Sequence, residues 1–196
     1  MCIRDRHYAA RAAKLTQRFN QSIDEGGFWD PRKKLYVYWR EKDDSIHGDN
    51  MVVPVNFMAI AYGICQDEGR IAAILDQIET QTANEGLFFW PLCLTSFKYE
   101  EVAQNASIMW PFPAYENGDI FRSWGDVGVR SYARTRPEIA MKYVRQVIAQ
   151  YEKDGLAFQR YLRRDQKGAG DDILAGNALT FVGLYRGILG IQPKYN

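Results

Sequence analysis

Residues 115–132 read YENGDIFRSWGDVGVRSY. A polar turn over residues 116–119, with Gly118 inside it, runs directly into a segment whose apolar residues recur at helical spacing. The turn is therefore expected at the mouth of a helical scaffold, with carboxylates beside aromatic side chains. Aromatic faces stack on the apolar side of a pyranose, and acids and amides bind its hydroxyl groups, so the pattern favours a sugar site. A helix N-cap followed by aromatic core residues explains it equally well.

The composition is that of one globular domain with a sizeable core. The 196 residues are 46% hydrophobic and 25% charged, which excludes a disordered, collagen-like or coiled-coil chain. The net charge of +1 gives no reason to expect a nucleic acid or an anionic membrane as partner. No apolar run approaches the ~20 residues that cross a bilayer. Aromatic residues make up 14% of the chain, and many fall in loop-like stretches where a core does not need them.

Helical periodicity recurs in several segments of the chain. Helices are expected at about residues 8–24, 53–65, 68–82, 120–134, 137–152 and 173–188. Tight connections alternate with long aromatic ones around residues 28–50, 84–118 and 155–172. A short hairpin is predicted about the turn at 31–34, followed by a polar loop over 43–50. This alternation predicts an all-α array of helical hairpins whose long loops converge on one side, where a binding surface would be built.

Carboxylates and tryptophans are abundant in the long loops. Hydrolysis of a glycosidic bond needs two carboxyl groups, one to protonate the leaving oxygen and one to activate water. The first candidates for this chemistry are Glu116 and Asp119, with Asp49 behind them. A single acidic loop residue is nevertheless more often a solvated surface group. The candidate sugar platforms and hydroxyl partner are Trp39, Trp110, Tyr115, Trp124 and Asn117.

The residues required for a metal site, a Ser-His-Asp triad or a nucleotide-binding motif are missing from this sequence. His47 stands alone, and Cys65 and Cys93 lie in apolar surroundings without CxxC spacing. We therefore expect neither a metal site nor a Ser-His-Asp arrangement. The glycine motifs of dinucleotide and P-loop sites are missing, so no cofactor is expected. A terpenoid or lanthionine cyclase is disfavoured because the chain has neither a DDxxD cluster nor a Cys/His zinc set.

Three stretches resemble the C-terminal half of six-hairpin glycosidases. They are FWD…YVYW…HGDNMVVPVNFMAIAYGI from residue 28, PAYENGDIFRSWGDVGVRSYA from residue 113, and GLAFQRYLRRDQKGAGDDILAGNALTFVGLYRGILGIQP from residue 155. The resemblance covers about residues 26–193, and its most specific piece is the Tyr-x-Asn-Gly turn that begins at Tyr115. The chain is most similar to the branch with glycogen-debranching, mannosylglycerate-hydrolase-like and trehalase-like enzymes.

The resemblance implies a glycoside hydrolase with an (α/α)6 toroid, acting on an oligosaccharide through an inverting pair of carboxylates. A toroid of this kind has about twelve helices, so residues 7–196 are expected to be the C-terminal part of the catalytic domain. The missing N-terminal half of the chain would be its partner. Residues 1–6, MCIRDR, resemble translated adapter sequence at the ends of metagenomic reading frames and are left out of the fold prediction. The cellular compartment therefore stays open.

One departure from the family concerns Gln159. Where many relatives carry a Glu before an aromatic residue in the last loop, this chain reads Phe158-Gln159-Arg160-Tyr161. The usual base is thus absent from its expected place. Two alternatives follow: Asp171 or Asp172 substitutes for it, or the chain is a non-catalytic carbohydrate-binding or assembly module on the same scaffold.

Overall fold

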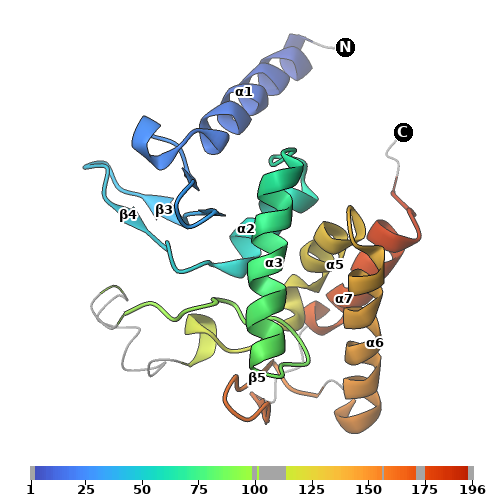
Figure 1. The fold of residues 1–196 in the computed structure, drawn as a ribbon. Helices are drawn as coiled ribbons and strands as arrows, with labels where there is room; N and C mark the ends of the chain where they lie inside the picture. The colour runs from blue at the N-terminus through green and yellow to red at the C-terminus, as the bar shows by residue number, and fades with distance from the viewer. Residues whose placement is uncertain (1–2, 99–100, 102–113, 156, 171–174, 194–196) are drawn as a thin grey trace.

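The computed structural model describes residues 3–98, 101, 114–155, 157–170 and 175–193, arranged as Figure 1 shows. The α-helices are α1 (Ile3–Asn20), α2 (Val53–Ala61), α3 (Glu68–Asn84), α5 (Gly125–Ala133), α6 (Pro137–Asp154) and α7 (Leu179–Gly183). The 3-10 turns are η1 (Ile23–Glu25), η3 (Tyr115–Asn117), η4 (Arg122–Trp124) and η5 (Ala175–Ala178), and a π-helical turn, η6 (Leu184–Ile188), extends α7.

Short antiparallel strand pairs decorate the connections between the helices. They are β1 (Trp29–Asp30) with β2 (Leu35–Tyr36), β3 (Trp39–Arg40) with β4 (Ile46–His47), and β5 (Arg160–Tyr161) with β6 (Gly168–Ala169). The predicted all-α class, with β-like pieces confined to the loops, is confirmed. None of the helices in the described ranges is long and apolar enough to cross a bilayer.

Local sequence explains several of the element boundaries. The Asp67 carboxylate accepts a hydrogen bond from the Arg70 amide at the start of α3, at 2.9 Å. Pro137 occupies the first turn of α6, where its missing amide hydrogen has no partner to lose. Gly155 ends α6 in the left-handed conformation, with φ of 65°. These signals explain why the predicted and observed starts of α3 and α6 coincide.

The segment after the first hairpin differs from the polar loop predicted there. The predicted hairpin about residues 31–34 is β1–β2, but the polar loop predicted over 43–50 contains strand β4, which pairs with β3. In this pairing Trp39 lies opposite His47, and their rings stack with centroids 4.6 Å apart. Such a cross-strand ring contact stabilises a pair too short to show alternation in the sequence.

The core of the helical layer is unusually aromatic. Phe57, Trp90, Tyr132 and Tyr143 are all fully buried, and the Trp90 ring lies 4.6 Å from that of Tyr143 and 4.9 Å from that of Phe57. A methyl group on Gly128 of α5 would come within 2.2 Å of the Trp90 ring. The close packing of α5 on Trp90 therefore requires glycine at this position.

The buried face of α3 agrees with its prediction, whereas that of α6 agrees only in part. The predicted face of α3, formed by Ile71, Ile74, Leu75 and Ile78, is fully buried, as expected. On α6 the buried stripe is Ala140, Tyr143, Val144 and Val147, whereas the predicted member Tyr151 is 56% exposed. Tyr151 continues the helical spacing but lies in the last turn of α6, outside the buried stripe.

The long loops converge on one side of the helices, as predicted. Backbone hydrogen bonds join Val53 to Leu92 at 2.8 Å and Leu92 to Asp119 at 3.0 Å. Ile120 and Tyr161 then exchange a pair of backbone bonds at 2.9 and 3.0 Å. The segments around residues 53, 92, 119 and 161 thus lie side by side, although they are distant in the sequence. This layer carries the candidate site.

The buried phenols make the fold sensitive to alkali. Burial raises the pKa of Tyr36, Tyr132 and Tyr143, and it raises the pKa of the Cys93 thiol to about 12. Above about pH 10 the unfolded chain releases protons that the folded chain retains, so the free energy of unfolding is expected to fall. Each proton retained corresponds to a slope of about 1.4 kcal/mol per pH unit.

Urea unfolding between about pH 8 and pH 11 measures this slope. Tyr143→Phe removes one of the retained protons and should make the slope shallower, whereas Tyr151→Phe alters an exposed phenol and should leave it unchanged. A free energy of unfolding that stays constant across this range would contradict the prediction.

Candidate functional site

A pocket of about 670 Å³ opens where the long loops meet. Its wall is mostly apolar and aromatic, with few polar groups, as is typical of small-molecule sites. The lining comes from the β3 segment, the start of α2, residues 92–97 and 101, η3 and η4. The residues that line it are Tyr38, Trp39, Val52, Pro54, Val55, Met58, Leu92, Cys93, Phe97, Glu101, Glu116, Asn117 and Trp124.

One wall of the pocket is a group of aromatic rings. The rings of Trp39 and Phe97 have centroids 6.1 Å apart and planes 28° from parallel. The rings of Tyr38 and Trp39 have centroids 5.0 Å apart and are nearly perpendicular. The Trp39 indole nitrogen donates a hydrogen bond to Glu41 at 2.9 Å, which fixes the ring orientation. Trp124, 37% exposed, lines the pocket from the end of η4. Trp39 and Trp124, both predicted as sugar platforms, thus line one cavity.

Two carboxylates lie in the same pocket. Glu116, the first candidate acid of the sequence, lies at the centre of η3, is exposed and belongs to the pocket lining. The second is Glu101, which sequence reasoning did not select. Its carboxylate accepts a hydrogen bond from the Lys98 amide at 2.9 Å, which holds it near Phe97. The available signal was an acidic residue inside a long aromatic loop, the same signal that selected Glu116.

The backbone of the η3 turn adopts an unusual conformation. Tyr115 has φ of 57° and Gly118 has φ of 139°, and a positive φ is costly for a bulky residue such as tyrosine. The Tyr115 carbonyl accepts hydrogen bonds from the amides of Gly118 at 3.2 Å and Asp119 at 2.9 Å. These bonds keep the turn tight and direct residues 116 and 117 towards the pocket.

Asn117 joins this turn to the opposite wall of the pocket. Its side-chain oxygen accepts a hydrogen bond from the Phe97 amide at 2.6 Å, and its side-chain nitrogen donates to the Phe97 carbonyl at 3.2 Å. The Ser96 hydroxyl donates to the Asn117 carbonyl at 2.6 Å. Asn117 therefore lies in the pocket lining, and its side-chain amide is bonded to the Phe97 backbone.

Asp119 lies beneath the turn and not in the pocket lining. The residue is 2% exposed, and one carboxylate oxygen accepts hydrogen bonds from the Tyr115 amide at 2.8 Å and from Arg160 Nε at 3.0 Å. The other oxygen accepts one from the Arg163 amide at 3.1 Å. Tyr115 is also outside the lining, and its ring packs against Phe121 and under the Arg160 guanidinium. Asp119 thus ties the turn to the β5–β6 segment.

The remaining predicted residues are distributed elsewhere. Asp49 is an exposed carboxylate that pairs with Lys33 and is not part of the pocket lining. Trp29 is also outside the pocket lining, because it is buried in the core beneath the Arg70 guanidinium. Trp110, Asp171 and Asp172 lie outside the described residues.

Gln159 contacts the same turn from the residue before β5. Its side-chain nitrogen donates to the Tyr115 hydroxyl at 3.4 Å, and its backbone amide donates to the Gly170 carbonyl at 3.0 Å. Gln159 is therefore next to the turn that bears Glu116. An amide at this place cannot accept or release a proton at neutral pH.

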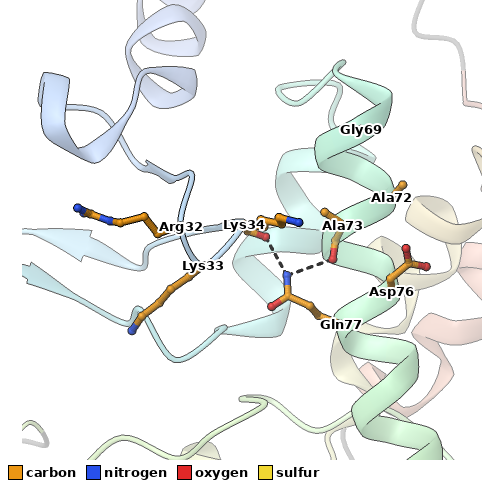
Figure 2. Close-up of a pocket in the computed structure, with 8 residues that line it drawn as sticks. All are labelled: Arg32, Lys33, Lys34, Gly69, Ala72, Ala73, Asp76 and Gln77. Carbon is orange, nitrogen blue, oxygen red and sulfur yellow. Dashed lines mark hydrogen bonds between the residues drawn. The ribbon is translucent and has the colours of Figure 1, made fainter.

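A second cavity, of about 560 Å³, lies between the first hairpin and α3 (Figure 2). Figure 2 shows the side chains of Arg32 and Lys33 pointing away from α3, while Gln77 bonds the Lys34 carbonyl at 3.0 Å. Arg32 pairs with Asp24 and Lys33 with Asp49, so this surface already neutralises much of its charge. The carboxylate in its lining, Asp76, pairs with Arg136 at 2.7 Å. Within the described ranges, no set of three or more His, Cys, Asp or Glu residues is arranged to hold a metal ion.

Comparison with known proteins gives matches at the level of structure. No protein-family model matches the sequence, and no curated protein matches it either. Similar solved structures are those of GH63 mannosylglycerate hydrolase from Thermus thermophilus, with Tris and D-glycerate and with glucose. Their TM-scores are both 0.61, at 13% and 14% identity.

These matches cover 81% of this chain but only 35% and 37% of the two structures. The chain thus spans about a third of the length of the proteins it resembles. At such low identity the likeness concerns the fold, and the chain shares part of the helical scaffold of these six-hairpin glycosidases, the fold relationship that the sequence resemblance predicted.

Proposed function

We propose that the chain is part of a glycoside hydrolase and binds an oligosaccharide in the 670 Å³ pocket. The observation that carries this proposal is the presence of two indole rings, Trp39 and Trp124, and two carboxylates, Glu101 and Glu116, in one lining. Ring faces provide stacking surfaces for the apolar side of a pyranose, and carboxylates accept hydrogen bonds from its hydroxyl groups. The glycosidase-like scaffold supports the same assignment.

The carboxylates of the pocket have distinct proposed roles. Glu116 is the general acid or base, because it lies in the lining on a turn whose position is held from below. Glu101 is the second carboxyl, and inversion would require the two groups to lie roughly 6.5–9.5 Å apart in the complex with substrate. Asp119 holds the turn, and Asp49 is the reserve candidate among the sequence-predicted acids.

The missing partner of the chain is part of the same proposal. The N-terminal half of the toroid, expected from the family resemblance, would cover apolar side chains that are exposed here. Leu15 on α1 is 60% exposed, and Tyr185 and Leu189 at the other end of the chain are 54% and 56% exposed. The N-terminal part of helix α1 projects from the molecule in Figure 1, whereas Phe19 and Asn20 at its other end contact the core.

The second candidate function is a carbohydrate-binding module without catalysis. It is favoured by Gln159, which occupies the expected place of an acid and bonds to the Tyr115 hydroxyl. Both candidates require sugar binding in the pocket, and they differ only in turnover. A single protein preparation can therefore separate them.

The experiment has two parts. In the first, the chain is titrated with mono- and oligosaccharides, and binding is monitored by tryptophan fluorescence. In the second, hydrolysis of a panel of aryl glycosides is measured. Binding is expected to change the emission of Trp39 and Trp124, which line the pocket. Trp39→Ala should weaken binding about tenfold, which corresponds to the loss of about 1.4 kcal/mol from one aromatic contact. Tyr151→Ala removes an exposed ring outside the lining and serves as the control.

The outcomes of this experiment are distinct. Binding with turnover supports the hydrolase, and binding without turnover supports the module. If no sugar changes the fluorescence, or if Trp39→Ala binds as tightly as the parent chain, the pocket is not a carbohydrate site.

A further inference from the structure

We propose that the 670 Å³ pocket selects its carbohydrate by charge, binding an amino sugar more tightly than the neutral sugar and disfavouring the corresponding uronic acid. This inference rests on the proposed function, since it assumes that the pocket binds a sugar. It adds a substrate class that neither the fold nor the scaffold comparison specifies. The charges in and around the pocket lining support this selection.

The charged side chains that the described lining contains are acidic. Glu101 and Glu116 contribute two negative charges, and no Lys or Arg is found among the described residues that line the pocket. Both carboxylates are on the solvent-exposed side of the pocket. An ammonium group on a bound sugar would be attracted to them, whereas a carboxylate would be repelled.

The nearby arginines, Arg160 and Arg163, form hydrogen bonds and ion pairs with other partners. The Arg163 guanidinium bonds both oxygens of Glu85, at 2.7 and 2.6 Å, and the carbonyls of Cys93 and Leu94, at 2.8 and 2.7 Å. Arg160 pairs with Asp119 at 3.0 Å. Lys98 follows Phe97 in the chain but is exposed and outside the lining. Neither arginine is therefore available to neutralise the two carboxylates of the pocket.

The aromatic wall acts in the same direction as the carboxylates. The faces of Tyr38, Trp39, Phe97 and Trp124 carry partial negative charge, and such faces attract a cation placed over them. An anion over the same faces is repelled. An ammonium group between the rings and the two glutamates would gain from both contributions, whereas an uncharged hydroxyl group at the same place would gain only a weaker hydrogen bond to a carboxylate.

A matched series of sugars tests the proposal. Methyl 6-amino-6-deoxyglucoside, methyl glucoside and methyl glucuronide differ only in the group at carbon 6, and the corresponding mannosides form a second series. Dissociation constants are measured by calorimetry and tryptophan fluorescence at low ionic strength and again at high salt, about 0.5 M. The amino sugar is expected to bind about fivefold more tightly than the neutral sugar, and the neutral sugar about fivefold more tightly than the uronic acid. Because both carboxylates are exposed, salt should reduce these steps.

The variants identify the source of the selection. In the double variant Glu101→Gln, Glu116→Gln the spread of affinity across each series should shrink to less than about twofold. The matched control is Glu138→Gln, Glu152→Gln, which removes the same charge from the exposed surface of α6 and should keep the full spread. The comparison separates pocket charge from net charge.

The failures of the two proposals are distinguishable. Equal affinities across a series, tightest binding of the uronic acid, or an unchanged spread in the double variant would overturn charge selection and leave the carbohydrate site intact. If no member of either series binds at any ionic strength, the proposed carbohydrate site fails, and charge selection fails with it.

Discussion

Replacement of Glu116 by Gln is expected to lower the rate of glycoside hydrolysis ~10²–10⁴-fold, the usual cost of removing a general acid or base. Glutamine keeps the size of the side chain and its acceptor oxygen, so the pocket and its sugar contacts should be preserved. What is lost is the ability to transfer a proton. The measurement is kcat and KM on an aryl glycoside, and the loss should lie mainly in kcat.

The control for this variant is Asp49→Asn. Asp49 is also an exposed carboxylate, but it pairs with Lys33 and is not part of the pocket lining. Its replacement should leave turnover within about twofold of the parent chain. Near-normal turnover by Glu116→Gln, with normal stability, would contradict the assignment and move the chemistry to Glu101.

The second large effect is on stability, and it concerns Asp119. Asp119→Asn is expected to lower the free energy of unfolding by about 3 kcal/mol, because a buried ion pair loses one partner. The three hydrogen bonds to its carboxylate come from donors on Tyr115, Arg160 and Arg163. An asparagine has a single acceptor oxygen, so its amide group would face at least one of these donors. Urea unfolding at neutral pH measures the loss.

Asp49→Asn serves again as the comparison for Asp119→Asn. The side chains of Asp49 and Lys33 are both about half exposed, so the ion pair between them should contribute no more than about 1 kcal/mol. An Asp119→Asn chain with the stability of the parent would contradict the positioning role. If that stable variant also lost turnover, Asp119 would return to the group of reacting carboxylates.

The elements of this fold were largely determined by local sequence. The apolar residues of α3 recur at helical spacing, and all four predicted positions from Ile71 to Ile78 are buried. Pro137 and Gly155 mark the two ends of α6. The turn at 31–34 predicted the first hairpin. Such features depend on neighbouring residues along the chain, so periodicity and turn chemistry are sufficient to predict them.

The composition of the candidate site was decided by the tertiary structure. Glu116 and Asp119 belong to one turn, yet Glu116 lines the pocket and Asp119 is buried beneath it. The difference arises from Arg160 and Arg163, 41 and 44 positions further along the chain, whose donors bond the Asp119 carboxylate. Sequence spacing within the turn contains no information about these donors.

The tryptophans show the same division. Trp29 and Trp39 flank one hairpin region, but Trp29 is covered by Arg70 of α3 and Trp39 lines the pocket. Local sequence therefore determined which residues form helices and hairpins. Only packing between distant segments decided which acids and rings remain accessible, because burial is a property of the contacts that the folded chain brings together.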